Sequence, residues 1–262
     1  MQHQLGEAFG NGQLRVCYDP ILDLGSGRIC AAQAQLCWQH PCDGVIGHAH
    51  IQQLAQHAQL STRLDQWWLD ATCRQLSLWQ QRAHHDWQLS LPVSSAQLCR
   101  PQFVSQVEHS LSTHAVAPTD LRIAVDEAQL RPDFSAARRA LQRLSGLGVG
   151  VVLGAFRFGY ATLPQLQSLP LQELGICPSL IAGIEYDPHC RAVVSSITSL
   201  ARALTLKVLA SGVSTATQQA WLAETGIDAI QGRMVGSAGC AAELSRLARE
   251  QARQQWCFYQ RS

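Results

Sequence analysis

The stretch LGVGVVLGAFRFGYATLPQLQSLPLQELGIC, residues 147–177, decides the fold. It contains two short apolar segments, VGVVL at 149–153 and LQELGI at 171–176, that are typical of buried strands. Gly146 and Gly148 stop the preceding helical pattern just before the first of these segments. Strands that alternate with helical patterns in this way indicate βα units, which build a largely parallel sheet with helices outside it.

The same pattern extends over nearly the whole chain. Strands are predicted at 14–21, 29–37, 88–93, 121–125, 149–153, 171–176, 206–210 and 227–230. Amphipathic helices are clearest at 63–78, 134–144 and 191–204. About eight such units favour closure into a barrel over an open sheet, and no GxGxxG motif follows any strand. The first two strands are separated only by DLGSGR, so we expect them to form an antiparallel hairpin.

Composition narrows the function classes. Apolar residues make up 47% of the 262 residues and charged residues 15%, with a net charge of +1, which is typical of a folded protein. No basic stripe suits nucleic acid, and no long apolar run, cationic amphipathic helix or signal peptide suits a membrane. We therefore expect a cytoplasmic protein with no nucleic-acid or membrane contact. The ten cysteines show no CxxC pairing, so most are interpreted as reduced, small hydrophobic residues.

Five segments, taken in order, resemble the EAL domain family. The opening segment is similar to the family's Tyr-Gln-Pro-Ile strand and EALLRW motif, and the others are similar to its VNLSA, LEITES, DDFGTGY-to-LKID and AEGVE-to-QG blocks. They are CYDPILDLGSGRICAAQAQLCWQHPCDGVI (17–46), SLPVSSAQL (90–98), LRIAVDEAQL (121–130), the quoted stretch at 147–177, and LKVLASGVSTATQQAWLAETGIDAIQG (206–232). The resemblance implies an EAL-type (β/α)8 barrel whose first strand is antiparallel to the rest. It implies a single domain over 1–262, with the resemblance covering 5–237 and a C-terminal helix at 240–256.

The resemblance also implies a two-metal hydrolase of cyclic di-GMP, in which carboxylates hold the ions that activate a water. This chain departs from that pattern at every position where the family keeps a metal ligand. Those positions are Gln33, Pro92, Ala124, Gly154 and Ala155. The family's phosphate-pairing arginine falls on Cys37. Other family groups orient water, complete the metal shell or contact the nucleotide, and their positions are Gly175, Cys177, Ser211 and Ser214. We therefore expect no catalytic residue, no metal and no cofactor at these vestigial site positions.

Two family positions are retained. Glu127 matches the second glutamate of LEITE, and the resemblance implies that it braces the loop after the strand at 149–153. Gln231 matches the glutamine near the nucleotide. The candidates for nucleotide contact are Asp19, Phe156, Arg157 and Gln231. Asp19 stands where the family has glutamine and would repel phosphate, whereas Arg157 could serve as a substitute anchor.

The leading hypothesis from sequence is a non-enzymatic regulatory module of bacterial cyclic-di-GMP signalling. It would bind a protein partner or a neighbouring domain of its own chain, and whether it forms a homodimer is open. The alternative is a metal-free cyclic-di-GMP receptor, and an unrelated enzyme built on the barrel is a third, less favoured hypothesis. A zinc site at Cys37 and Cys177 is disfavoured because zinc requires three or four ligands.

Overall fold

The computed structural model describes residues 2–82, 86–159 and 161–259. Nine strands form one sheet in the order β1-β9-β8-β7-β6-β5-β4-β2-β3, and a further pairing of β1 with β2 closes eight of them into a barrel. The barrel strands are β1 (Leu14–Asp23), β2 (Arg28–His40), β4 (Gln88–Pro92), β5 (Leu121–Asp126), β6 (Gly150–Phe156), β7 (Glu173–Ile176), β8 (Lys207–Ser211) and β9 (Ala229–Gln231). The short β3 (Gly44–Gly47) pairs with β2 alone.

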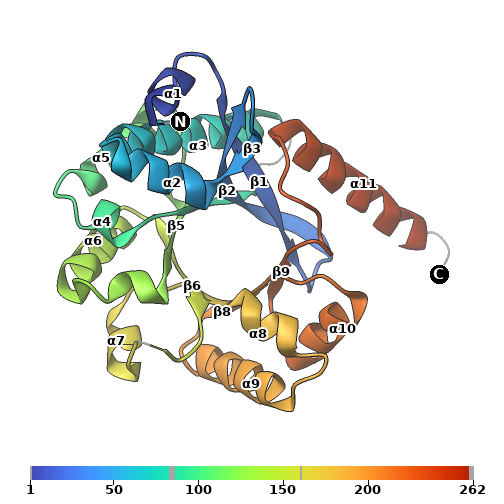
Figure 1. Ribbon diagram of the computed structural model, residues 1–262. Helices are drawn as coiled ribbons and strands as arrows, with labels where there is room; N and C mark the ends of the chain where they lie inside the picture. Colours follow the sequence, from blue (N-terminus) through green and yellow to red (C-terminus); the bar gives the residue numbers. More distant parts are fainter. Residues whose placement is uncertain (1, 83–85, 160, 260–262) are drawn as a thin grey trace.

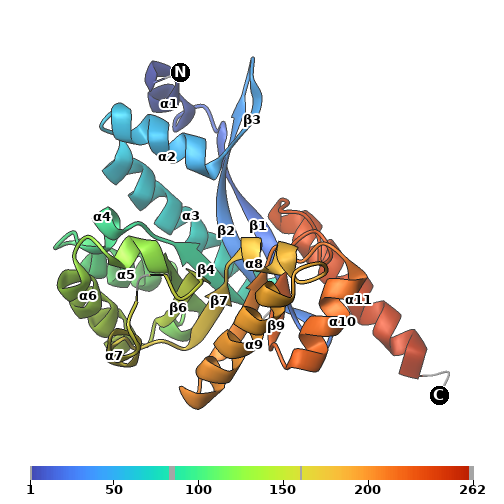
Figure 2. The same cartoon turned by 60° about the horizontal axis from the view of Figure 1, so that its bottom comes forward.

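Helices surround this barrel (Figure 1). They are α1 (Gln2–Ala8), α2 (His48–His57), α3 (Ser61–Arg82), α4 (Ser95–Leu98), α5 (Phe103–Thr113), α6 (Phe134–Gly146), α7 (Leu163–Ser168), α8 (Pro178–Gly183), α9 (Pro188–Ala203), α10 (Ala216–Thr225) and α11 (Ala241–Tyr259), with short 3-10 turns at Pro118–Asp120 and Glu127–Leu130. The far end of α11 projects away from the barrel in both ribbon views (Figures 1 and 2). Among the described helices, none has the length and hydropathy of a membrane span.

The predicted fold class is confirmed. β1 runs antiparallel to both β2 and β9, whereas β2 and β4 to β9 pair in parallel along the rest of the ring. The first five residues of β5 are buried, as expected for a strand covered on both faces. Helix α6 begins where the Asp133 side chain accepts a hydrogen bond from the Ala136 amide, and it ends at Gly146.

Three local features differ from the sequence-based expectations. The pattern predicted no strand at Gly44–Gly47, because four residues bounded by glycines have no periodicity and pair only at the sheet edge. The segment with His48, His50 and His57 has no HExxH motif and the pattern of a surface helix, which predicts a solvated face for these histidines, but the His48 ring packs 4.7 Å from the Trp68 ring. Burial lowers the pKa of His48. The C-terminal helix spans Ala241–Tyr259, against the predicted 240–256.

The inside of the barrel contains a buried ion pair between the two strands that flank β6. Arg122 of β5 and Glu173 of β7 lie on inward-facing positions, and the Arg122 Nη1 donates to the Glu173 Oε2 at 2.8 Å. The two side chains are 7% and 5% exposed. Gly150 of β6, between them, leaves room for Arg122, because a Cβ at position 150 would lie 2.8 Å from the arginine Cγ. The pair therefore depends on a strand position without a side chain.

This ion pair generates a stability prediction. Glu173→Gln leaves the Arg122 guanidinium buried without a counter-charge, and we expect it to lower the free energy of unfolding by about 3 kcal/mol. Replacing both members, as Arg122→Met with Glu173→Leu, removes the buried charge altogether and should recover most of that loss. Urea unfolding monitored by circular dichroism measures both changes.

The exposed pair Arg246 and Glu250 on α11 is the matched control. Their side chains are 71% and 53% exposed and lie 3.6 Å apart. Glu250→Gln should change the unfolding free energy by less than about 0.5 kcal/mol, because solvent screens such pairs. Equal effects of Glu173→Gln and Glu250→Gln would show that the internal pair does not stabilise the barrel.

Candidate functional site

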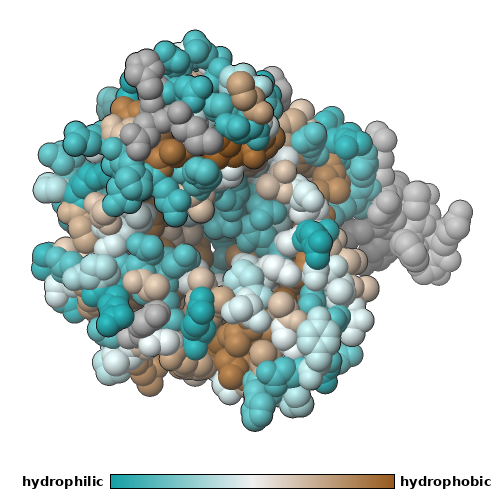
Figure 3. All heavy atoms as spheres, in the orientation of Figure 1, coloured by the Kyte–Doolittle hydropathy of each residue, from teal (hydrophilic) through white to brown (hydrophobic). Residues whose placement is uncertain are grey.

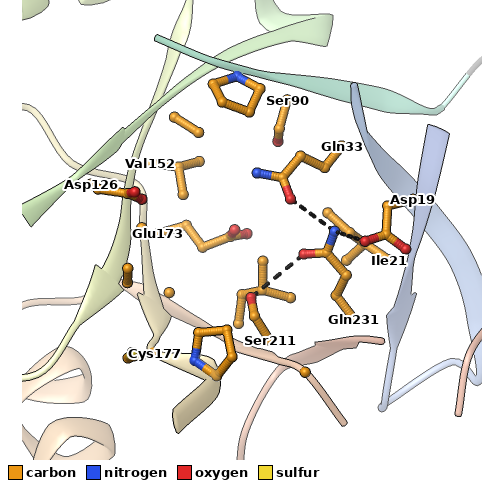
Figure 4. Close-up of a pocket in the computed structure, with 18 of the residues that line it drawn as sticks. Asp19, Ile21, Gln33, Ser90, Asp126, Val152, Glu173, Cys177, Ser211 and Gln231 are labelled. Atoms are coloured by element: carbon orange, nitrogen blue, oxygen red, sulfur yellow. Dashed lines mark hydrogen bonds between the residues drawn. The ribbon is translucent and has the colours of Figure 1, made fainter. Parts of the chain in front are cut away.

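A pocket of about 500 Å³ opens at the C-terminal ends of the parallel strands. This is the end at which barrels of this class place their functional groups. The space-filling view shows a hollow near the centre of this face (Figure 3). Side chains from strands all around the ring point into it (Figure 4).

The structure gathers most of the sequence-predicted positions around this pocket. The lining includes eight of the ten vestigial positions, namely Gln33, Pro92, Ala124, Gly154, Ala155, Gly175, Cys177 and Ser211. Cys37 and Ser214 are not among the described lining residues. Of the nucleotide-contact candidates, Asp19, Arg157 and Gln231 line the pocket. Phe156 does not, because its side chain is fully buried and packs against the Phe158 ring at 5.0 Å.

A hydrogen-bond network centred on one amide joins four strands on one wall of the pocket. The Gln231 side-chain amide on β9 donates to the Asp19 Oδ2 at 2.9 Å and to the Gln33 Oε1 at 2.9 Å. Its carbonyl oxygen accepts from the Ser211 hydroxyl at 3.5 Å (Figure 4). Burial raises the pKa of the Asp19 carboxyl, and the hydrogen bond from Gln231 offsets only part of that rise. Gln231 thus fixes the orientation of Asp19 on β1 and Gln33 on β2.

On the opposite wall, the Asp126 carboxylate takes the space of a missing side chain. A Cβ at Gly154 would lie 2.7 Å from the Asp126 Oδ1, and one at Gly175 would lie 3.3 Å from the Gly154 Cα. Burial raises the pKa of Asp126, and the charge of Arg157 partly lowers it. The two glycines therefore let β6 and β7 approach closely and let Asp126 turn across the end of β6.

The loop after β6 is held by one buried carboxylate. Glu127 is 1% exposed. It accepts hydrogen bonds from the backbone amides of Arg157 at 3.2 Å, Gly159 at 3.4 Å and Ala161 at 2.8 Å. Ala155 and Phe158 have positive φ angles of 49° and 58°, which are strained for residues with a side chain. The carboxylate compensates for this strain by satisfying several amides of the loop at once.

Glu173 is a pocket residue that the sequence reasoning missed. Its carboxylate points toward the middle of the pocket (Figure 4), and its Oε1 has no hydrogen-bond partner among the described residues. The available signal was the two-residue period of strands, which places Glu173 on the same face as Gly175. A single glutamate in an apolar segment gave no reason to apply it.

The cysteines differ from the expected picture. Cys17 and Cys37, on neighbouring strands, form a disulfide with a Cα–Cα distance of 6.2 Å. Cys42 and Cys240 are exposed, while Cys73 and Cys177 are buried free thiols as expected. No local pattern indicates the disulfide, because its partners lie 20 residues apart and meet only through the hairpin register.

The residues of the pocket do not fit the pair of divalent ions that the fold family implies. Mg²⁺ and Mn²⁺ require several converging hard oxygen ligands. Within the described ranges, no group of three or more His, Cys, Asp or Glu side chains is placed to hold a metal ion. The three acidic pocket residues, Asp19, Asp126 and Glu173, come from β1, β5 and β7 and do not converge on one point.

Comparison with known proteins establishes the family. The EAL domain model matches residues 2–238, and the chain therefore belongs to the EAL domain family. It is 34% identical over 92% of its length to the bifunctional diguanylate cyclase/cyclic di-GMP phosphodiesterase MucR of Pseudomonas aeruginosa. It is 31% identical over 88% of its length to the cyclic di-GMP phosphodiesterase NbdA of the same organism. The chain spans 35% and 30% of these two relatives.

A solved structure gives the same result. The PaMucR phosphodiesterase in complex with c-di-GMP superimposes with a TM-score of 0.89 at 33% sequence identity. The match covers 92% of this chain and 98% of that one. These findings place the chain in the EAL domain family, among whose members are proteins named cyclic di-GMP phosphodiesterases.

The comparisons contradict one expectation from the sequence. The prediction that the chain is not an enzyme is wrong by this measure, because MucR and NbdA are both named cyclic di-GMP phosphodiesterases. The replaced residues are single positions of the pocket, whereas the relatives match over most of the chain.

The geometry of Glu127 gives a prediction for the loop after β6. Glu127→Gln replaces one acceptor oxygen by an amide group that cannot accept from the loop amides, at a cost of about 2 kcal/mol. We expect the loop to open more often, so that trypsin cleaves after Arg157 at least about ten-fold faster under native conditions. Limited proteolysis followed by mass spectrometry measures the rate at this bond.

The control for this experiment is Glu108→Gln on α5, where the side chain is exposed. It removes the same charge without touching the loop. A cleavage rate after Arg157 that is the same in both variants would contradict the bracing role of Glu127.

Proposed function

We propose that this domain binds cyclic di-GMP in the pocket at the C-terminal ends of its barrel strands. The observation that carries the proposal is the similarity, at 33% identity and a TM-score of 0.89, to a phosphodiesterase solved as a complex with c-di-GMP. Binding is the step that a phosphodiesterase and a receptor share, so the proposal does not depend on the metal ligands. Cyclic-di-GMP binding thereby moves ahead of the protein-interaction hypothesis, because a similar domain has been solved with this ligand.

The shape and polarity of the pocket support this ligand. A cavity of about 500 Å³ is within the size range of small-molecule sites. Gln33, Ser90, Ser211 and Gln231 offer amide and hydroxyl groups that can exchange hydrogen bonds with a nucleobase or a ribose.

The charges of the pocket determine where the phosphates of such a ligand can lie. Arg157 is the only cationic side chain among the described lining residues. A guanidinium can donate two parallel hydrogen bonds to a phosphate, which is the strongest contact available there. Asp19 and Asp126 oppose an anion, and we expect one phosphate to lie against Arg157.

Isothermal titration of the 262-residue chain with cyclic di-GMP tests the proposal. We expect a dissociation constant of about 10 μM or tighter, which corresponds to roughly −7 kcal/mol. The absence of a heat of binding at about 100 μM ligand would overturn it. Because the relatives are named phosphodiesterases, the same samples are analysed with Mg²⁺ and with Mn²⁺ for the linear dinucleotide, and turnover would place the domain among the enzymes.

The phosphate contact is tested by substitution. Arg157→Gln should weaken binding about ten-fold, because a charge-assisted hydrogen bond contributes about 1.5 kcal/mol or more. Arg143→Gln, on the exposed surface of α6, is the charge-matched control and should leave the affinity unchanged. Equal affinities of the two variants would exclude Arg157 as the anchor.

Binding should depend on pH through the two carboxyls whose pKa burial raises. Above their raised pKa values, Asp19 and Asp126 are charged and repel the phosphates. Protonation below those values removes the repulsion, while the phosphates keep their charge. Affinity for cyclic di-GMP should therefore increase as the pH falls through the raised pKa values of these two carboxyls.

The double variant Asp19→Asn and Asp126→Asn identifies the source of this dependence. Its affinity at high pH should approach the value that the unmodified chain reaches at low pH, and its titration curve should be flat. A profile that is unchanged in the double variant, or an affinity that increases with pH, would contradict the assignment.

A further inference from the structure

Arg15 lies on the same face of β1 as the pocket residue Asp19. Asp19 and Ile21 line the pocket, and strand residues alternate between the two faces, so Arg15 and Cys17 belong to the inward-facing row. No register shift interrupts β1 between Arg15 and Ile21. At about 3.3 Å per residue, Arg15 is about 13 Å further along β1 than Asp19. The pocket mouth lies at the C-terminal ends of the parallel strands, and β1 runs antiparallel to its barrel neighbours. The beginning of β1, where Arg15 lies, is therefore on the side of the mouth.

The hairpin register sets Arg15 directly opposite Cys37. Position 37 is where the EAL resemblance places a phosphate-pairing arginine, and here its side chain is joined to Cys17. Facing residues on one side of an antiparallel pair have Cβ atoms about 5 Å apart. A guanidinium from position 15 can therefore reach much of the space that one from position 37 would reach.

The side chain of Arg15 is available for a ligand. It is exposed, and it makes no hydrogen bond or ion pair with the described residues of the chain. β1 and β2 continue beyond the other barrel strands on this side, as the second ribbon view shows (Figure 2). Arg15 thus stands at the rim of the mouth and not within the packed wall.

Arg15 and Arg157 stand on opposite walls of the barrel. In the ring order β1, β9, β8, β7, β6, β5, β4, β2, the strand β6 is four places from β1 in either direction. Arg157 directly follows β6, and Arg15 is near the beginning of β1. Two guanidiniums across one mouth suit a ligand that carries two separated phosphates, because each can pair with one of them.

We propose that Arg15 is a second phosphate contact of this site, so that Arg15 and Arg157 together bracket the two phosphates of a cyclic dinucleotide. The contact has moved one strand across, from position 37 on β2 to position 15 on β1. This inference rests on the proposed function, since it assigns a further residue to the same ligand. It also states a specificity, because a ligand with one phosphate can engage only one of the two arginines.

Titration of Arg15→Gln with cyclic di-GMP at low and at moderate salt tests the inference. Because Arg15 is exposed, we expect binding about five-fold weaker at low ionic strength and a smaller loss when salt screens the contact. Arg28→Gln is the matched control, since Arg28 is exposed on the same hairpin at the end of β2 far from the mouth. It should change the affinity by less than about two-fold.

Competition with GMP provides the specificity readout. If the two arginines bracket two phosphates, the Arg15→Gln and Arg157→Gln effects on cyclic di-GMP add in the double variant. In Arg15→Gln, the ratio of the affinity for cyclic di-GMP to the affinity for GMP should fall by about five-fold. The reason is that the substitution weakens binding of the dinucleotide about five-fold and leaves binding of GMP unchanged. Thermal unfolding of each variant shows that the fold is retained.

The outcomes separate the two proposals. If the unmodified chain binds cyclic di-GMP and Arg15→Gln behaves like Arg28→Gln, the role of Arg15 is wrong and the proposed function stands. Equal weakening for cyclic di-GMP and GMP would likewise overturn the bracket of two phosphates. If the unmodified chain binds no cyclic di-GMP, both proposals are overturned.

Discussion

The pairing of β1 with β2 on one side and β9 on the other is the constraint on which the site depends. It closes the sheet into a barrel through ten pairs with β2 and three with β9. It brings Gln231 into contact with Asp19 and Gln33, which precede it by 212 and 198 residues. Because β1 runs against its neighbours, its early residues lie at the mouth and its later ones inside. An opening of this seam would separate the amide network and remove one wall of the pocket.

The chain keeps the fold of its family although the residues at the family's site positions have changed. The segments that match the family form strands and helices whose apolar residues pack outside the barrel and are constrained by volume. The inward residues near the mouth are free of that constraint, and here they are small or neutral at the family's ligand positions. Carboxylates lie elsewhere, with Asp126 over Gly154 and Glu173 beside Arg122. The pocket remains polar although its charges are rearranged.

Much of the fold was predictable, because its signals are local. The periodicity of strands and helices, Asp133 as a helix cap and Gly146 as a stop all act within a few residues. The missed features are those that depend on partners distant in sequence. His48 was expected in solvent but meets Trp68 on another helix, and Cys17 meets Cys37 only through the hairpin register. The prediction of a non-enzymatic protein was contradicted by relatives whose similarity extends over the whole domain.

The sequence alone determined that the chain is an EAL-type barrel and which residues stand at the family's site positions, because apolar periodicity and motif order are properties of the chain itself. The tertiary structure decided which of those residues meet. It made Gln231 the centre of a network, set Asp126 in place of a side chain at position 154, and put Glu173 inside the pocket. It also placed Arg15 and Arg157 across one mouth, since barrel closure alone makes β1 and β6 opposite walls.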